Sequence, residues 1–179
     1  MDKSEGYVSS AYLQSAAHVL ARVKERSYEL MQIAPGCKVL DVGCGPGIDT
    51  LALARLVGDG GAVVGIDSDP AMVAEANRLA TEAGVDAWTR HEIGNASALR
   101  CKAGSFEACR SERLFQHLAN PSESLAEMAR VTRSSGWVVA ADTDWGSLSI
   151  GVKDADIERR VVRVVAEQLH RNGYGARQQ

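Results

Sequence analysis

Residues 39–47, which read Val-Leu-Asp-Val-Gly-Cys-Gly-Pro-Gly, decide the fold of this chain. The apolar run from Cys37 to Val42 has the length of a buried strand, and glycines follow it at once at positions 43, 45 and 47. Glycines directly after a buried strand let the main chain approach a ligand where a Cβ would collide. The helix expected next offers free N–H groups toward the same space. The stretch therefore predicts a small-ligand loop rather than an ordinary glycine-rich turn.

Two familiar nucleotide-binding loops do not fit these residues. The dinucleotide fingerprint needs a glycine where this chain has Ile48. The phosphate-loop pattern fails because no Gly-Lys-Ser/Thr follows the glycines. Asp41, two residues before the first glycine, is unattractive for a pyrophosphate and suits a cationic group instead.

Strands and helices alternate on both sides of this loop. The expected strands are Cys37–Val42, Ala62–Ile66, Ala87–Ile93, Phe106–Ser111 and Trp137–Ala141. The expected helices are Ser10–Met31, Thr50–Val57, a helix capped by Asp69 that begins at Pro70 and runs to about Ala83, Ser122–Arg133 and Asp154–Asn172. Such alternation implies βαβ units and a parallel sheet, with ligands bound beyond the carboxyl ends of the strands.

The loop resembles the first motif of the class I S-adenosylmethionine-dependent methyltransferases, and the resemblance extends from Val39 to about Trp145. It implies a Rossmann-like, doubly wound α/β fold with strand order 3-2-1-4-5, an N-terminal and a C-terminal helix, and no sign of the family's last two strands. We expect a single domain over residues 1–179, divided into a helical cap (1–35), a core (36–145) and a C-terminal helix and tail (146–179). The residues that would hold the methionine part of the cofactor are Asp41, Gly43, Gly45 and Gly47.

The end of the second strand supplies the next cofactor residues. Asp67 lies roughly twenty residues beyond the loop, where a carboxylate accepts hydrogen bonds from ribose hydroxyls. By resemblance, Asp67 and the neighbouring Ser68 bind the ribose, whereas Asp69 fits a helix cap better. Met72 resembles the apolar residue that packs on adenine; ordinary core packing is the alternative.

Two further segments complete the predicted site. Asn95 would accept a hydrogen bond from the adenine amino group beside the main-chain N–H of Ala96, although a plain Gly-Asn turn is the alternative. Ser111 would face the methionine moiety. Glu112, Arg113 and His117 would line or flank the acceptor side.

His117 and Glu112 are the candidate catalytic residues. An imidazole with an ordinary pKa near 6.5 accepts a proton at neutral pH. The alternative is a histidine that only supports a helix or packs on the sheet.

The segment before the fifth strand resembles a conserved turn of the family, but Ser134 and Ser135 replace its Pro-Gly pair. Asp142 to Trp145 would reach the acceptor pocket or anchor packing. A fifth strand with no further strand on its outer side would be an uncovered apolar edge, which proteins usually avoid. We therefore expect a homodimer or a partner strand to cover that edge.

Bulk properties restrict the function classes. The chain has 179 residues and a formal charge of -3, which argues against a nucleic-acid partner. It has neither a membrane-length apolar run nor a secretory signal, so we expect a cytoplasmic protein without a membrane partner. The cysteines contain no CxxC pair, which favours reduced thiols and no metal site.

The resulting hypothesis is methyl transfer from S-adenosylmethionine to a small-molecule acceptor by in-line displacement. The protein would mainly supply alignment and a dry site. Two alternatives remain at this point. The fold could perform other chemistry with the same cofactor, as a cyclase does, or the chain could be a cofactor-binding subunit that is inactive without a partner.

Overall fold

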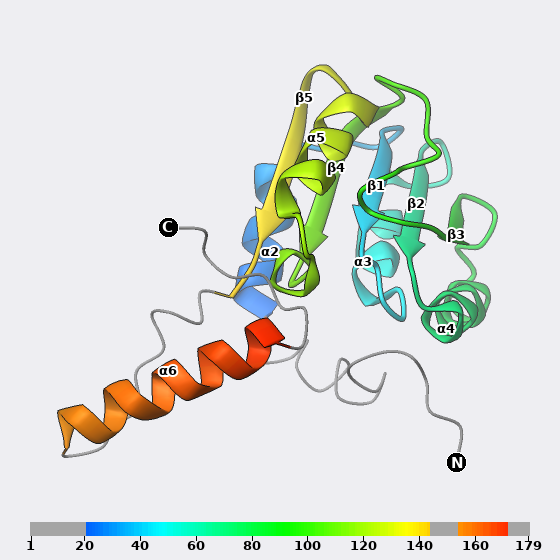
Figure 1. The fold of residues 1–179 in the computed structure, drawn as a ribbon. Helices are drawn as coiled ribbons and strands as arrows, with labels where there is room; N and C mark the ends of the chain where they lie inside the picture. Colours follow the sequence, from blue (N-terminus) through cyan, green and yellow to red (C-terminus); the bar gives the residue numbers. More distant parts are fainter. Residues whose placement is uncertain (1–20, 144–153, 172–179) are drawn as a thin grey trace.

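The computed structural model describes residues 21–143 and 154–171 (Figure 1). Its centre is a five-stranded, all-parallel sheet of order β3-β2-β1-β4-β5. The strands are β1 (Lys38–Val42), β2 (Ala62–Asp67), β3 (Thr89–Ile93), β4 (Phe106–Glu112) and β5 (Thr132–Ala141). The helices are α2 (Ala21–Leu30), α3 (Ile48–Val57), α4 (Pro70–Glu82), α5 (Pro121–Val131), α6 (Ala155–Arg171) and the short 3-10 helix η1 (Phe115–His117). The predicted fold class and strand order are confirmed.

Helices cover both faces of the sheet, and alternation along each strand divides the core between them. Val39 of β1 packs with Leu53 of α3 on one face, and Leu40 packs with Met128 of α5 on the other. In Figure 1, α5 lies in front of β4, and α3 lies on the opposite face. Both faces of the sheet are therefore packed, and the carboxyl ends of β1, β2 and β4 lie together at one end of the strands.

The turn before β5 differs from its prediction. The helix predicted to run to Arg133 ends at Val131, and β5 begins at Thr132 instead of Trp137. Ser135 has a φ of 65°, in the left-handed region that the missing glycine would favour. The pairing of β4 with β5 also shifts register between Phe106 and Ala108. An irregular strand start therefore occupies the segment where the resemblance implied a turn.

Helix α2 buries the side that its sequence pattern did not predict. Lys24 and Ser27 are buried, whereas Val23 is 52% exposed and Leu30 is 41% exposed. Helical periodicity in the sequence predicts Val23 and Leu30 on the buried face, and this prediction is wrong in the described part of the helix; residues 10–20 lie outside that part. The reason is electrostatic, because carboxylates at the end of the sheet require cationic partners and α2 provides one.

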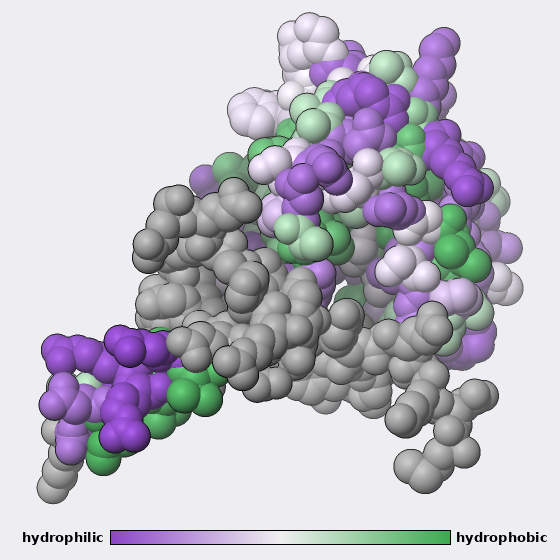
Figure 2. Space-filling model, viewed as in Figure 1, coloured by the Kyte–Doolittle hydropathy of each residue, from purple (hydrophilic) through white to green (hydrophobic). Residues whose placement is uncertain are grey.

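Among the described residues, β5 pairs with β4 on one side and forms an edge of the sheet. Trp137 on this strand is 44% exposed. Helix α6 projects away from the sheet, and Figure 2 shows apolar side chains along one side of it and polar ones along the other. Cover of the β5 edge by a second copy stays a prediction. None of the helices within 21–143 and 154–171 is long and apolar enough to cross a membrane.

Candidate functional site

The glycine loop after β1 is packed too tightly for side chains. Gly43 has a φ of 74°, and a Cβ there would lie 2.9 Å from Leu114 Cδ1. Gly47 has a φ of 82°, and its Cβ would lie 2.8 Å from the Cβ of Ala76 on α4. The main-chain N–H of Gly43 donates to the carbonyl oxygen of Ile66 at 2.7 Å, which ties the loop to the end of β2. Both the conformation and the space at these positions require glycine.

Asp67 at the end of β2 is held by main-chain donors. Its Oδ2 accepts a hydrogen bond from the Gly45 N–H at 2.8 Å, and its Oδ1 accepts one from the Asp69 N–H at 3.0 Å. Asp69 in turn accepts a hydrogen bond from the Ala71 N–H at 2.8 Å, which confirms it as the cap of α4. Asp67 therefore lies half-buried beside the glycine loop with a fixed orientation.

A buried polar chain supports the loop from behind. Thr50 Oγ1 lies 2.8 Å from the carbonyl oxygen of Gly47 and 2.7 Å from His91 Nε2. His91 Nδ1 lies 3.0 Å from Asn77 Oδ1. Burial lowers the pKa of His91 to about 4, so the ring is neutral at physiological pH. The sequence did not predict this series of hydrogen-bonded side chains, because Thr50, Asn77 and His91 lie on three separate elements.

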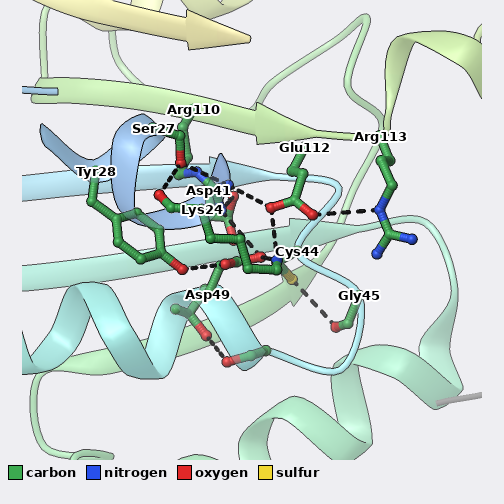
Figure 3. Close-up of polar contacts among 12 residues, drawn as sticks. Lys24, Ser27, Tyr28, Asp41, Cys44, Gly45, Asp49, Arg110, Glu112 and Arg113 are labelled. Carbon is green, nitrogen blue, oxygen red and sulfur yellow. Dashed lines mark hydrogen bonds and ion pairs between the residues drawn. The ribbon is translucent and has the colours of Figure 1, made fainter. Parts of the chain in front are cut away.

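Asp41 lies at the centre of a buried charge cluster (Figure 3). It is 2% exposed and faces the fully buried Arg110 on β4, the residue that pairs with it across the sheet. Arg110 Nη1 lies 3.4 Å from Asp41 Oδ1 and 3.2 Å from Asp49 Oδ2, and its Nη2 lies 3.0 Å from Glu112 Oε2. A single guanidinium thus contacts three carboxylates.

Helix α2 contributes the second cation of the cluster. Lys24 Nζ lies 2.6 Å from Asp49 Oδ2 and 2.6 Å from Glu112 Oε2. The Tyr28 hydroxyl donates to Asp49 Oδ1, and the Tyr28 ring centroid lies 5.2 Å from the guanidinium carbon of Arg110. Three elements distant in sequence, α2, α3 and β4, therefore meet around the end of β1.

The cluster shifts the ionisation of its members in different directions. Burial raises the pKa of Asp41 to about 7; Arg110 opposes this shift, and the negative charge of Asp49 adds to it. Burial also acts to raise the pKa of Asp49, but Arg110 and Lys24 outweigh it and hold that pKa below its usual value. Among the carboxylates of the cluster, Asp41 is thus the one that is most readily protonated near neutral pH.

Three acceptor atoms in this region are buried without a hydrogen-bond donor among the residues the structure describes. They are Asp41 Oδ2, Ser111 Oγ and Glu112 Oε1. Glu112 Oε1 has an ion-pair contact with Arg113 Nε at 3.4 Å. Buried acceptors without donors are rare in proteins and suit a ligand that carries N–H groups. The set fits an amino-acid ammonium group at the mouth of the glycine loop.

The residues predicted to contact the nucleoside differ in their exposure to solvent. Ser68 is exposed at the start of α4, and Met72 is buried in its first turns. Asn95 is exposed, its Oδ1 accepts a hydrogen bond from the Ser97 N–H at 2.9 Å, and Ala96 is half-buried. The Asn95 side chain therefore closes a local turn, and its contact with adenine stays a prediction.

The predicted acceptor side lies around the end of β4. Arg113 has a φ of 52°, an uncommon conformation for a residue other than glycine. His117 lies half-buried in η1, and burial lowers its pKa, with Asp142 opposing and Arg113 adding to the shift. Asp142 Oδ2 accepts a hydrogen bond from the Phe115 N–H at 2.6 Å, so it anchors η1. Asp144 and Trp145 lie outside the described residues.

Sequence reasoning missed the cations of the charge cluster. Arg110 lies in β4, whose sequence Phe-Glu-Ala-Cys-Arg-Ser-Glu mixes apolar and polar residues, so its charge alone did not indicate a buried ionic partner. Lys24 and Ser27 are three positions apart on α2, the spacing of one helix face. Nothing in the local pattern of α2 marks that face as the buried one.

The fold and the loop together define a Rossmann-like class that binds a cofactor beyond the carboxyl ends of parallel strands. The chain belongs to the methyltransferase domain family, whose sequence profile matches residues 40–140. S-adenosylmethionine is the cofactor of this class. Helix α2, which carries Lys24, precedes the matched region.

Known proteins resemble the chain over parts of their lengths. A protein of Streptomyces fradiae, an uncharacterised 37.1 kDa protein in transposon Tn4556, is 37% identical over 86% of this chain and 45% of its own length. A ubiquinone biosynthesis O-methyltransferase of Maricaulis maris is 30% identical over 59% of this chain and 40% of its own length. The chain thus spans less than half the length of these two relatives. The crystal structure of a SAM-dependent methyltransferase from Aquifex aeolicus shares the fold with a TM-score of 0.64 at 21% identity, and the match covers 82% of this chain and 78% of that one.

Proposed function

We propose that this domain binds S-adenosylmethionine at the glycine loop and transfers its methyl group to a small-molecule acceptor. The observation that carries the proposal is Asp41 Oδ2, which is buried without a hydrogen-bond donor among the described residues and lies beside a loop whose Gly43 and Gly47 leave no room for a Cβ. A cationic amino-acid tail would satisfy that oxygen. Ser111 Oγ and Glu112 Oε1 offer two further acceptors next to it.

Each end of the cofactor has a proposed set of partners. Asp41 would hold the ammonium group, while the main chain at the glycines lies against the amino-acid tail. Asp67 already accepts one main-chain hydrogen bond on each oxygen, and each oxygen retains a lone pair for a ribose hydroxyl. Met72, Ala96 and Asn95 would flank the adenine.

The bound cofactor supplies an electrophilic methyl group on a sulfonium sulfur. The protein would orient the acceptor in line with that methyl and exclude water from the reacting atoms. His117 would accept the acceptor's proton at an imidazole nitrogen, because its lowered pKa keeps the ring neutral at physiological pH. Glu112 is committed to Lys24 and Arg110 through Oε2, which supports a structural rather than a proton-accepting part for this residue.

The name of the Maricaulis maris relative supports a small organic acceptor, as does the net charge of -3, which is unfavourable for a nucleic acid. We propose the cytoplasm as the site of action. We further propose that a second copy covers the β5 edge; a monodisperse monomer in light scattering at tens of micromolar would count against it.

Isothermal titration with S-adenosylhomocysteine tests the cofactor site. Asp67→Ala and Asp41→Asn should each weaken binding about tenfold or more, because each removes a charge-assisted contact worth roughly 1.5–3 kcal/mol. Asp86→Asn, an exposed carboxylate beyond α4, is the control and should bind like the wild type. Unchanged affinity in either site variant would show that its assignment is wrong.

Release of S-adenosylhomocysteine from labelled cofactor in the presence of candidate phenols and amines tests the transfer step. A protein that binds the cofactor but releases no product with any acceptor would favour the binding-subunit or cyclase-like alternative.

A further inference from the structure

We propose that Lys24 on helix α2 is a positioning residue for the cofactor's amino-acid end, acting through Arg110 on Asp41. The inference rests on the proposed function of the glycine loop and extends it to a helix that lies before the family-matched region. Lys24 contributes no atom to the loop itself. Its effect is exerted through the carboxylates that it shares with Arg110.

The two cations compete for the same two oxygen atoms. Asp49 Oδ2 lies 2.6 Å from Lys24 Nζ and 3.2 Å from Arg110 Nη1. Glu112 Oε2 lies 2.6 Å from Lys24 Nζ and 3.0 Å from Arg110 Nη2. Lys24 makes the shorter contact with both atoms, so it shares with Arg110 the neutralisation of Asp49 and Glu112.

Because Lys24 also contacts Asp49 and Glu112, Arg110 can keep its contact with Asp41. Its contact with Asp41 Oδ1, at 3.4 Å, is the longest of its three carboxylate contacts. Without Lys24, Asp49 and Glu112 would draw the guanidinium toward themselves, and Asp41 would lose its counter-charge. The contact through Oδ1 also leaves Oδ2 without a hydrogen-bond donor among the described residues.

Charge balance gives the same result. Three buried carboxylates, those of Asp41, Asp49 and Glu112, face the two buried cations, and Arg113 contributes a partly exposed third. Removal of one buried cation from a low-dielectric site favours protonation of the carboxylate that ionises least readily. That carboxylate is Asp41, whose pKa is already about 7. A protonated Asp41 would no longer attract an ammonium group.

The groups that act on Asp41 come from every element packed around it. They are Arg110 and Glu112 on β4, Asp49 on α3, and Lys24 and Tyr28 on α2. The thiols of Cys44 and Cys109 also lie near it, but burial raises their pKa values and keeps them neutral. At neutral pH the charged groups that change the pKa of Asp41 are therefore the members of the charge cluster.

The test is the affinity for S-adenosylhomocysteine, measured by isothermal titration from pH 6 to 8.5. In the wild type, affinity should rise with pH through about 7 as Asp41 ionises. Lys24→Met should displace the rise to higher pH by about one pKa unit, which weakens binding about fivefold at pH 7 because the ionised fraction of Asp41 falls from about one half to about one tenth. Lys24→Arg should restore both. Arg26→Met, which breaks an exposed pair with Glu29 on the same helix, is the matched control and should match the wild type.

A second variant, with the opposite expected shift of the pH profile, keeps the proposal testable if Lys24→Met does not fold. Asp49→Asn removes a carboxylate and keeps both cations, so the rise in affinity should move to lower pH. The double variant Lys24→Met/Asp49→Asn removes one charge of each sign and should return the rise toward the wild-type pH.

The outcomes separate the two proposals. A wild type that binds S-adenosylhomocysteine, with an unmoved pH profile in Lys24→Met, overturns the positioning role alone. If Lys24→Met does not fold, an unmoved profile in Asp49→Asn overturns it. A wild type that fails to bind at any pH overturns the proposed function, and the positioning role with it.

Discussion

Asp41 and Asp67 end neighbouring strands of one sheet, yet they are held in different ways. Both oxygens of Asp67 accept main-chain N–H groups, from the glycine loop and from the start of α4. Asp41 is held instead by the side chain of Arg110, whose position depends on carboxylates from α3 and β4 and on a lysine from α2. The orientation of Asp67 depends only on the path of the main chain. Asp41 needs several side chains that are far apart in sequence, so its geometry and charge are open to substitution at distant positions.

Arg110→Met should have the largest effect on stability. It leaves three carboxylates in a buried site with one buried cation, and removing one partner from a buried ionic network costs about 3–5 kcal/mol. Urea unfolding followed by circular dichroism measures this loss. Arg78→Met breaks exposed pairs with Glu75 and Glu82 and should cost far less, because solvent screens both pairs. Equal losses in the two variants would mean that the buried cluster is no more sensitive than a surface pair.

Gly47→Ala should rank second and tests the region held by main chain. The added Cβ meets the Cβ of Ala76 at 2.8 Å in a left-handed conformation, and strain and overpacking together cost about 3 kcal/mol. Gly84→Ala is the matched control, because Gly84 also has a positive φ but open space around it, and it should cost about 1 kcal/mol. The difference between the two midpoints in urea isolates the close approach of the loop to α4. A control that is as destabilised as Gly47→Ala would contradict the packing argument.

The smallest of these effects concerns His91, which supports the glycine loop through Thr50. Its folded-state pKa of about 4 lies below its unfolded value, so the unfolded chain takes up a proton first as the pH falls. The His91 contribution to stability is complete above about pH 6.5 and is lost as the pH falls toward 4; between pH 7 and pH 5 it should decline by about 2 kcal/mol.

Urea unfolding at pH 7, 6 and 5 measures this decline. His91→Gln should show a shallower loss over the same range, because glutamine does not titrate while it retains polar atoms toward Thr50 and Asn77. Parallel slopes in the variant and the wild type would show that His91 does not carry this linkage.

The sequence was most informative where the signal is local. Apolar runs and helix caps predicted the alternation of strands and helices, and the resemblance to a known family implied the correct strand order. The glycine spacing located the loop within one residue of the observed end of β1. Asp69 was recognised as a cap because capping involves residues two or three positions apart. The turn before β5 was less well predicted, because Ser135 adopts a conformation that its side chain does not favour.

Local pattern could not reveal which face of α2 is buried or why Arg110 lies within a strand. Hydrophobic periodicity treats a lysine as exposed, and this rule fails when carboxylates from two other elements converge on the same point. The positions of the strands and helices and the shape of the glycine loop follow from short-range preferences of the backbone, which the residues of each segment carry themselves. The charge on Asp41 follows from burial and from partners brought together across the fold, because electrostatic energy depends on distance in space and not on distance along the chain.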